Sequence, residues 1–139
     1  MKVLFDTNVV LDVLMQREPH VEAAAKLFSL VDNGRIEGSI CATTATTIFY
    51  IAAKSFGDRR AREEIRGLLT LFDVAAVDKS VLNSALATGF SDYEDAVVHE
   101  AARAIGATAI VTRDREGFSA ASIPAMNPDE LLAAIAASP

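Results

Sequence analysis

Residues 3–8, VLFDTN, place a carboxylate directly after a short, continuous apolar run. A run with no polar interruption is typical of a strand that is buried on both faces, as in a parallel sheet. Thr7 is suited to cap the helix that we expect next, in which Val9 and Val10 begin an apolar stripe. In an open α/β sheet, the binding crevice lies at the carboxyl ends of the strands. Asp6 is therefore predicted to lie at a binding site.

Apolar runs alternate with segments of helical periodicity along the rest of the chain. Such alternation predicts a mostly parallel sheet with helices on both faces. We expect an α/β fold with three layers, α/β/α, a central sheet of four to five strands, and a single domain over residues 1–139. The expected strands are 3–5, 39–42, 74–77, 109–111 and 122–126, and the expected helices after the first are 21–31, 43–55, 58–71, 78–88, 91–105 and a closing helix from 129.

The composition excludes several classes of protein. Hydrophobic residues make up 51% of the chain, enough for a sizeable core, which excludes a disordered chain. A net charge of -6 has the wrong sign for holding nucleic acid by bulk charge, so nucleic-acid chemistry would need bound cations or a local basic patch. Cys41 is the only cysteine, which excludes an intrachain disulfide and suits a reducing cytoplasm. No apolar run approaches the roughly 20 residues of a membrane helix. We therefore expect a cytoplasmic protein with no membrane partner.

The segment SDYEDA, residues 91–96, opens a helix with three acids near its start. Ser91 and Glu94 have the spacing of a capping box, which is sufficient to explain Glu94. Asp92 has two interpretations: an acid that complements the helix dipole, or a ligand on the same helix face as Asp95. Asp95 lies deeper in the helix and gains less from the dipole, so it is predicted to be a ligand.

Asp114 follows the strand expected at 109–111 and completes a set of three acids with Asp6 and Asp95. Taken singly, Asp6 is better explained as a helix cap and Asp114 as a loop residue. Taken together, carboxylates at one crevice repel one another and raise their pKa values unless a cation lies between them. Mg²⁺ and Mn²⁺ prefer oxygen ligands, so His99 is predicted to belong to the polar face of its helix and not to the site. A carboxylate-bound metal activates water and neutralises phosphate charge, which favours phosphodiester hydrolysis.

A basic cluster at residues 54–66 has two interpretations. It could cradle an RNA backbone, with Arg59, Arg60 and, elsewhere in the chain, Arg113 as candidate RNA contacts. Alternatively, it is a solvated helix face, because acids follow two of these arginines by four residues, the spacing of helix ion pairs. The second interpretation is favoured, since most charge runs only solvate a helix.

Asp6-Thr7-Asn8, the Asp92/Asp95 turn and Thr112-Arg113-Asp114 occur in the order and spacing of the PIN-domain ribonucleases. The sequence resembles this family over nearly its whole length, and in particular the VapC-like toxins of bacterial toxin–antitoxin pairs. The resemblance implies an endoribonuclease that binds Mg²⁺ or Mn²⁺, cuts RNA, forms a homodimer and is held silent by a small antitoxin. It implies Asp6, Asp95 and Asp114 as catalytic metal-site acids, Asp92 as a fourth, and Asn8 and Thr112 as supporting polar groups.

The sequence departs from the family at one position. PIN domains usually carry a glutamate on the helix after the second strand, and by register this position falls at Thr47, with no acid between Gly38 and Gly57. A hydroxyl is a poor substitute for an anionic ligand, which leaves Asp92 to compensate. The alternative is a non-catalytic PIN-like module that binds RNA or a protein. Phosphohydrolases and receiver domains also use strand-end aspartates, but Asn8 stands where a dehalogenase-type hydrolase needs a second aspartate.

Overall fold

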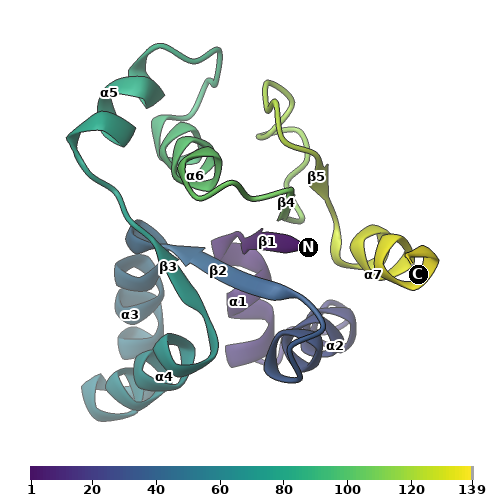
Figure 1. Cartoon of the computed structure of the whole chain (residues 1–139). Helices are drawn as coiled ribbons and strands as arrows, with labels where there is room; N and C mark the ends of the chain where they lie inside the picture. Colours follow the sequence, from purple (N-terminus) through teal and green to yellow (C-terminus); the bar gives the residue numbers. More distant parts are fainter. Residues whose placement is uncertain (139) are drawn as a thin grey trace.

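The computed structural model describes residues 1–138 and contains one parallel sheet of five strands (Figure 1). The strands are β1 (Lys2–Phe5), β2 (Glu37–Cys41), β3 (Asp73–Ala75), β4 (Ala109–Val111) and β5 (Ala125–Met126). Their order in the sheet is β3-β2-β1-β4-β5, and every neighbouring pair is parallel. The predicted parallel sheet is confirmed.

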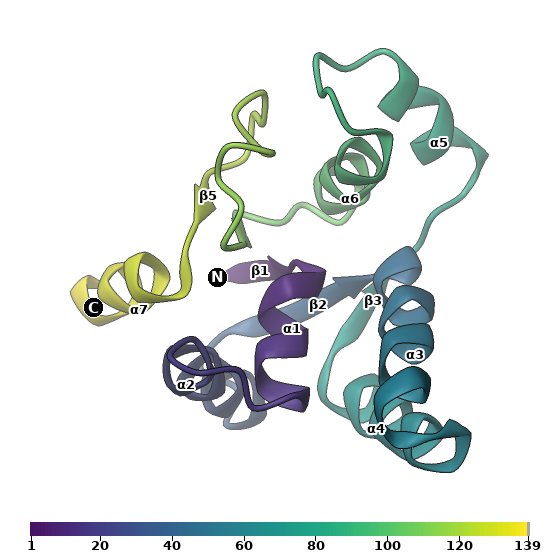
Figure 2. The same cartoon turned by 180° about the vertical axis from the view of Figure 1, so that it is seen from behind.

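Helices cover both faces of the sheet, which confirms the predicted three-layer architecture (Figures 1 and 2). One face carries α5 (Lys79–Leu86) and α6 (Tyr93–Ala104). The opposite face carries α1 (Thr7–Leu14), α2 (Val21–Asp32), α3 (Ala42–Phe56), α4 (Asp58–Leu71) and α7 (Pro128–Ala137). Within the described residues, no helix is long and apolar enough to cross a membrane.

Successive residues of the central strand, β1, belong to two separate hydrophobic clusters on opposite faces of the sheet. Val3 and Phe5 are fully buried in the cluster beneath α1 and α2, whereas Leu4 is fully buried in the cluster beneath α6. This follows from the two-residue period of a strand, because successive side chains point to opposite faces. Burial on both faces is the reason that residues 3–5 form a continuous apolar run.

The predicted helix caps Thr7 and Ser91 are wrong by one residue, whereas the interpretation of Asp6 as a helix cap is confirmed. Asp6, not Thr7, is the N-cap of α1, and its side chain accepts a hydrogen bond from the backbone N–H of Thr7. Asp92, not Ser91, is the N-cap of α6, and its side chain accepts from the backbone N–H of Asp95. Both positions have extended backbone, and aspartate caps a helix at least as well as serine or threonine does. Each acid therefore orients the start of its helix.

The direction of strand addition reverses at β1. From β1 the chain adds β2 and then β3 on one side, and later adds β4 and β5 on the other. Such a reversal leaves a crevice outside the carboxyl ends of the two strands that flank it, here β1 and β4. Asp6 directly follows β1, and Asp114 lies in the loop after β4. The topology thus brings the two aspartates to one edge of the sheet.

Candidate active site

A cavity of about 350 Å³ lies at the carboxyl ends of β1 and β4, next to the start of α6. Five carboxylates line it, and Arg17 is the only basic residue in its lining. All four acids that the sequence pattern singled out belong to this lining, together with Glu94, which the pattern assigned to a cap. The five acids are Asp6, Asp92, Glu94, Asp95 and Asp114.

The Asp6 carboxylate is buried and held in a fixed orientation. One oxygen accepts from the backbone N–H of Thr7 at 2.9 Å, and the other accepts from the Thr112 hydroxyl at 2.8 Å and the Asn8 side-chain amide at 3.3 Å. Burial raises the pKa of Asp6, the negative charges of Asp114 and Glu94 raise it further, and the hydrogen bonds from Thr112 and Thr7 act in the opposite direction. Protonation of Asp6, or a cation bound beside it, would offset this unfavourable negative charge.

Asn8 and Thr112, which were predicted to be supporting groups, both donate hydrogen bonds to the Asp6 carboxylate. The Asn8 amide also donates to the Thr112 hydroxyl, and the Asn8 side-chain oxygen accepts from the backbone N–H of Arg113 at 3.1 Å. Thr112 is fully buried, and its hydroxyl oxygen also accepts from the backbone N–H of Asp114 at 3.0 Å. These bonds tie the loop after β4 to the start of α1, so Asn8 and Thr112 act on Asp6 and on the backbone.

Asp95 is the acid whose ionisation responds most clearly to this environment. Burial raises the pKa of Asp95 to about 6, and the charges of Asp6, Asp92 and Asp114 add to the effect. Among the described residues, none donates a side-chain or backbone hydrogen bond to the Asp95 carboxylate. The Asp92 oxygen that caps α6 approaches the Asp95 backbone N–H at 2.9 Å. Asp92 therefore has a structural role in addition to its place in the cavity lining.

Gly117 provides space for two of the carboxylates. Its backbone N–H donates to Asp114 Oδ1 at 2.9 Å. A methyl group added at Gly117 would lie 2.5 Å from Asp114 Oδ2 and 3.0 Å from Asp95 Oδ2. These two oxygens, from the β4–β5 loop and from α6, thus approach the same small space beside Gly117. Sequence reasoning did not identify Gly117, because no local signal marks a glycine needed for a tertiary contact.

The donor set fits a hard divalent cation in its chemistry. All the acids offer oxygen, which Mg²⁺ and Mn²⁺ prefer, and the raised pKa values of Asp6 and Asp95 reflect negative charge that a cation would offset. Within residues 1–138, no three His, Cys, Asp or Glu side chains are grouped tightly enough to hold a metal ion by themselves. A cation here would complete its coordination with water, as Mg²⁺ commonly does. The metal role of these acids stays a prediction.

On α1, Asp12 lies outside the cavity lining, is fully buried and is paired with arginine. Arg113 donates two hydrogen bonds to it, from Nε at 2.7 Å and from an η-nitrogen at 3.1 Å, and Arg17 approaches it at 3.9 Å. The candidate RNA contact Arg113 is thus held by Asp12, while Arg17 extends to the acidic cavity. The sequence offered no signal for Arg17, because it lies in the irregular segment after α1.

His99 does not belong to a polar helix face, and that prediction is wrong. Its side chain is buried on α6, where Nε2 accepts from the backbone N–H of Ser122 at 3.1 Å. Because Nε2 is an acceptor, Nδ1 carries the proton and donates to Glu100 Oε2 at 2.8 Å. Residues 96–102 of α6 are all buried, since the helix packs against several elements at once. The hydrogen bond from Ser122 to His99 therefore connects the β4–β5 loop, which carries Asp114, to helix α6, which carries Asp95.

The other two candidate RNA contacts lie away from the acidic cavity. Arg59 and Arg60, on α4, pair with Glu63 at 4.0 Å and with Glu64 at 3.7 Å. Neither arginine lines the acidic cavity. These four-residue pairs agree with the solvated-face interpretation that the spacing favoured.

No acid from α3 reaches the cavity. Thr47 stands at the expected glutamate position, and its hydroxyl donates to the backbone oxygen of Thr43 at 3.1 Å. One turn earlier, the buried hydroxyl of Thr44 accepts from the Thr7 hydroxyl at 3.2 Å. Helix α3 therefore contributes no charged side chain near the site, and it reaches the site only through the contact of Thr44 with Thr7.

Three solved structures show how this architecture compares with known folds. VapBC2 from Rickettsia felis, bound to a DNA fragment from its promoter, matches with a TM-score of 0.72 at 13% identity, covering 91% of this chain and 98% of that one. A toxin–antitoxin complex from Klebsiella pneumoniae matches with a TM-score of 0.68 at 21% identity, covering 91% and 97%. VapC20 from Mycobacterium tuberculosis, a sarcin-ricin loop cleaving toxin, matches with a TM-score of 0.62 at 14% identity, covering 78% and 86%. At these identities the similarity shows a shared fold.

No curated protein matches the sequence. The family model of the PIN domain matches residues 2–116, a span that includes every acid of the cavity. On this evidence the chain belongs to the PIN domain family.

Proposed function

We propose that this protein is a metal-dependent endoribonuclease and the toxin of a type II toxin–antitoxin system. The observation that carries the proposal is the set of five carboxylates around one cavity at the sheet edge of a PIN domain. Five acids around one cavity would repel an anionic RNA unless a bound cation offset their charge, which supports metal dependence. The similar folds that are toxins or toxin–antitoxin complexes support the biological role.

In this proposal, Asp6, Asp95 and Asp114 hold Mg²⁺ or Mn²⁺. When bound, such an ion would neutralise phosphate charge and activate a water molecule. Asp6 is already oriented by its hydrogen bonds from Thr112 and Thr7, so it loses little freedom when it becomes a ligand. Asp95 and Asp114 approach from α6 and the β4–β5 loop, so the loop connection to α6 controls their separation.

Arg17 is the residue best placed to contact the RNA phosphate in the acidic cavity. It is the only basic residue in the lining, and its side chain is 39% exposed. It approaches Asp12 only at 3.9 Å and makes no closer ion pair in the described part of the chain, which leaves its guanidinium available to a phosphate. A guanidinium suits phosphate oxygens because it presents several N–H donors in one plane.

The acid that family members carry on α3 is replaced in this proposal by acids on α6. Asp92 has one oxygen engaged in capping and one left over, and Glu94 also lines the cavity. The uncharged α3 side of the site favours a second candidate, a PIN-like module that binds RNA without cutting it. The two candidates differ in whether any cleavage accompanies binding.

The test is RNA cleavage by purified protein with Mg²⁺, with Mn²⁺ and with a chelator. We expect cleavage only with the metal, and its loss in Asp95→Asn, which removes a charge and no hydrogen bond of the fold. Asp73→Asn makes the same change at an exposed position on β3 and should cleave normally. Metal-independent cleavage, or equal activity in Asp95→Asn, would contradict the proposal. RNA binding without cleavage would establish the non-catalytic candidate.

The toxin role has its own test. Induced expression in a bacterium should arrest growth, Asp95→Asn should not, and co-expression of the antitoxin that we expect to be encoded beside the gene should restore growth. Normal growth during expression of active, soluble enzyme would remove the toxin role and leave the nuclease assignment intact.

A further inference from the structure

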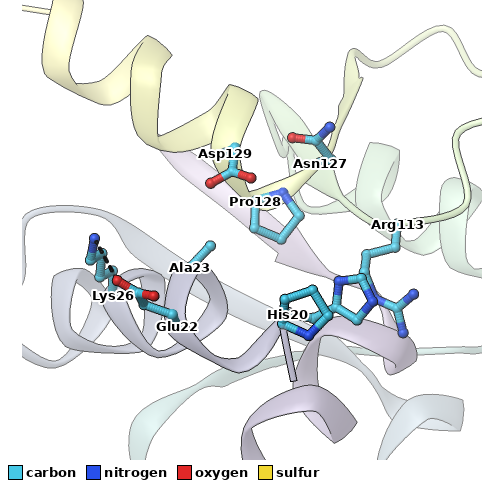
Figure 3. A pocket seen from close by; sticks show the side chains of 9 residues that line it. His20, Glu22, Ala23, Lys26, Arg113, Asn127, Pro128 and Asp129 are labelled. Atoms are coloured by element: carbon cyan, nitrogen blue, oxygen red, sulfur yellow. Dashed lines mark ion pairs between the residues drawn. The ribbon is translucent and has the colours of Figure 1, made fainter. Parts of the chain in front are cut away.

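A second and larger cavity, of about 630 Å³, lies between the start of α2 and the start of α7 (Figure 3). Its walls come from Arg113, from residues 127–129, and from the segment at the start of α2, where the lining residues are Pro19, His20, Glu22, Ala23 and Lys26. Small-molecule and nucleotide sites commonly have volumes of about 300 to 1,000 Å³. The cavity is therefore large enough for a nucleotide, and it contains none of the five acids of the first cavity.

The two cavities are immediate neighbours. Arg113 lines the second cavity, and Asp114, the next residue in the chain, lines the first. Consecutive Cα atoms are only about 3.8 Å apart. Arg113 also binds Asp12, which Arg17 of the acidic cavity approaches in turn. Because the two linings meet at Arg113 and Asp114, a single-stranded chain that passed over the acids could extend into this second cavity.

The lining combines the chemistry that a nucleotide requires. Pro19, Ala23 and Pro128 offer apolar surface against which a base can pack. Lys26 offers an ammonium group for a phosphate, and His20 adds an imidazole that can stack or donate. Figure 3 shows Lys26 beside Glu22 on α2, with Pro128 across the cavity from them.

The charges favour one nucleotide over an acidic peptide. Arg113 is compensated by buried Asp12, and Lys26 is paired with Glu22 at 3.7 Å on an exposed surface where the pair separates easily. Asp129 adds a further carboxylate to the lining. A single phosphate can be met by Lys26, whereas several carboxylates of an acidic segment would face Glu22 and Asp129 at close range.

Building on the proposed function, we propose that this second cavity is a substrate subsite that holds the RNA nucleotide next to the cleaved bond. The base packs on Pro19, Ala23 and Pro128, and Lys26 contacts its phosphate. The subsite increases the affinity for RNA and sets its register over the acids, so it acts on KM more than on kcat.

Two substitutions test the subsite by different means. Ala23→Leu narrows the cavity without adding an aromatic surface, and Lys26→Glu, at a 63% exposed side chain, reverses the charge without threatening the fold. Lys79→Glu makes the same charge change at an exposed position on α5 and serves as the control. Binding of a short fluorescein-labelled single-stranded RNA of mixed sequence is measured by anisotropy in the Asp95→Asn background, and KM and kcat are measured in the otherwise unchanged chain.

We expect RNA binding to weaken about fivefold in each cavity variant, the scale of losing a small apolar contact or one phosphate contact, with KM raised similarly and kcat nearly unchanged. Lys79→Glu should bind as the parent does. Unchanged RNA binding and KM in both cavity variants would overturn the subsite, and so would unchanged RNA binding together with weaker binding of an antitoxin peptide. If the unchanged chain does not cut RNA, the nuclease assignment fails by itself, and the anisotropy result still decides the subsite.

Discussion

Asp6 and Asp12 are both buried carboxylates at helix α1, yet their surroundings are opposite in sign. Asp12 receives two hydrogen bonds from the Arg113 guanidinium and a further approach from Arg17. Asp6 is held only by neutral donors and faces other acids, and its pKa is raised. A buried charge paired with a cation is a structural element, whereas one left among like charges gains from a ligand of opposite sign.

The largest effect on stability should come from removing the arginine that pairs with buried Asp12. Arg113→Leu would leave fully buried Asp12 with only the distant Arg17, and we expect a loss of about 3 kcal/mol in the free energy of unfolding. Urea denaturation followed by circular dichroism measures it. Arg115→Leu removes an exposed arginine paired with Glu130 and should cost no more than about 1 kcal/mol. Equal losses in the two variants would show that burial does not distinguish these pairs.

A second change disturbs the uncompensated acids and spares the fold. Gly117→Ala places a methyl group against the carboxylate ends of Asp114 and Asp95, which can move aside, so stability should change little. We expect Mn²⁺ affinity, measured by calorimetry, to fall about tenfold, as is typical when supporting contacts of metal ligands are disturbed. Gly67→Ala, where the added methyl group meets no atom within 4 Å, should bind Mn²⁺ normally. Normal affinity in Gly117→Ala would show that these two oxygens do not share an ion.

A third prediction concerns pH in the metal-free protein. The folded-state pKa of Asp95 is raised from 3.8 to about 6, so folding favours its protonated form. The contribution of Asp95 to the free energy of unfolding is fully present below about pH 4, where the side chain is protonated. This contribution is lost as the pH rises through about 6 and the side chain ionises. Asp95→Asn should therefore raise the melting temperature modestly above pH 6 and leave it unchanged near pH 4. A difference of the same size at both pH values would contradict the raised pKa of Asp95, which burial and the neighbouring acids cause, as the origin of the effect. Added Mn²⁺ should stabilise the unchanged chain more strongly above pH 6, where the acids are ionised.

The smallest effect should come from the fully solvated charges of α4. Arg59 is 96% exposed and pairs with Glu63 at 4.0 Å, so Arg59→Ala should change the free energy of unfolding by about 0.5 kcal/mol or less. RNA affinity should also be unchanged, because this arginine lies outside both cavities. A clear loss of RNA binding would show instead that the basic cluster at residues 54–66 contacts the RNA.

Local pattern was sufficient to predict much of the fold. The continuous apolar run at residues 3–5 predicted a doubly buried strand, and the alternation of elements predicted the parallel three-layer architecture. The acids after β1, at the start of α6 and after β4 were recognisable by position, and the structure places them at one cavity. Cap positions were missed by one residue, because serine, threonine and aspartate all cap helices and neighbouring candidates compete.

The missed features all depend on contacts between distant segments. His99 is buried because the segment at Ser122 packs over α6, Gly117 matters because Asp95 approaches it from another element, and Asp12 is compensated by an arginine far along the chain. None of these has a signature in the neighbouring sequence. Glu94 was assigned to a capping box for the same reason, since nothing nearby in sequence shows that its side chain borders Asp6.

Residue order thus specified which segments become strands and helices and where acids follow them, because periodicity and capping are properties of neighbouring residues. Three-dimensional packing settled which carboxylates meet, which one receives an arginine and which remain mutually repulsive, because electrostatic energy depends on distance and burial and not on separation along the chain. The difference between Asp6 and Asp12 arises entirely at that second level.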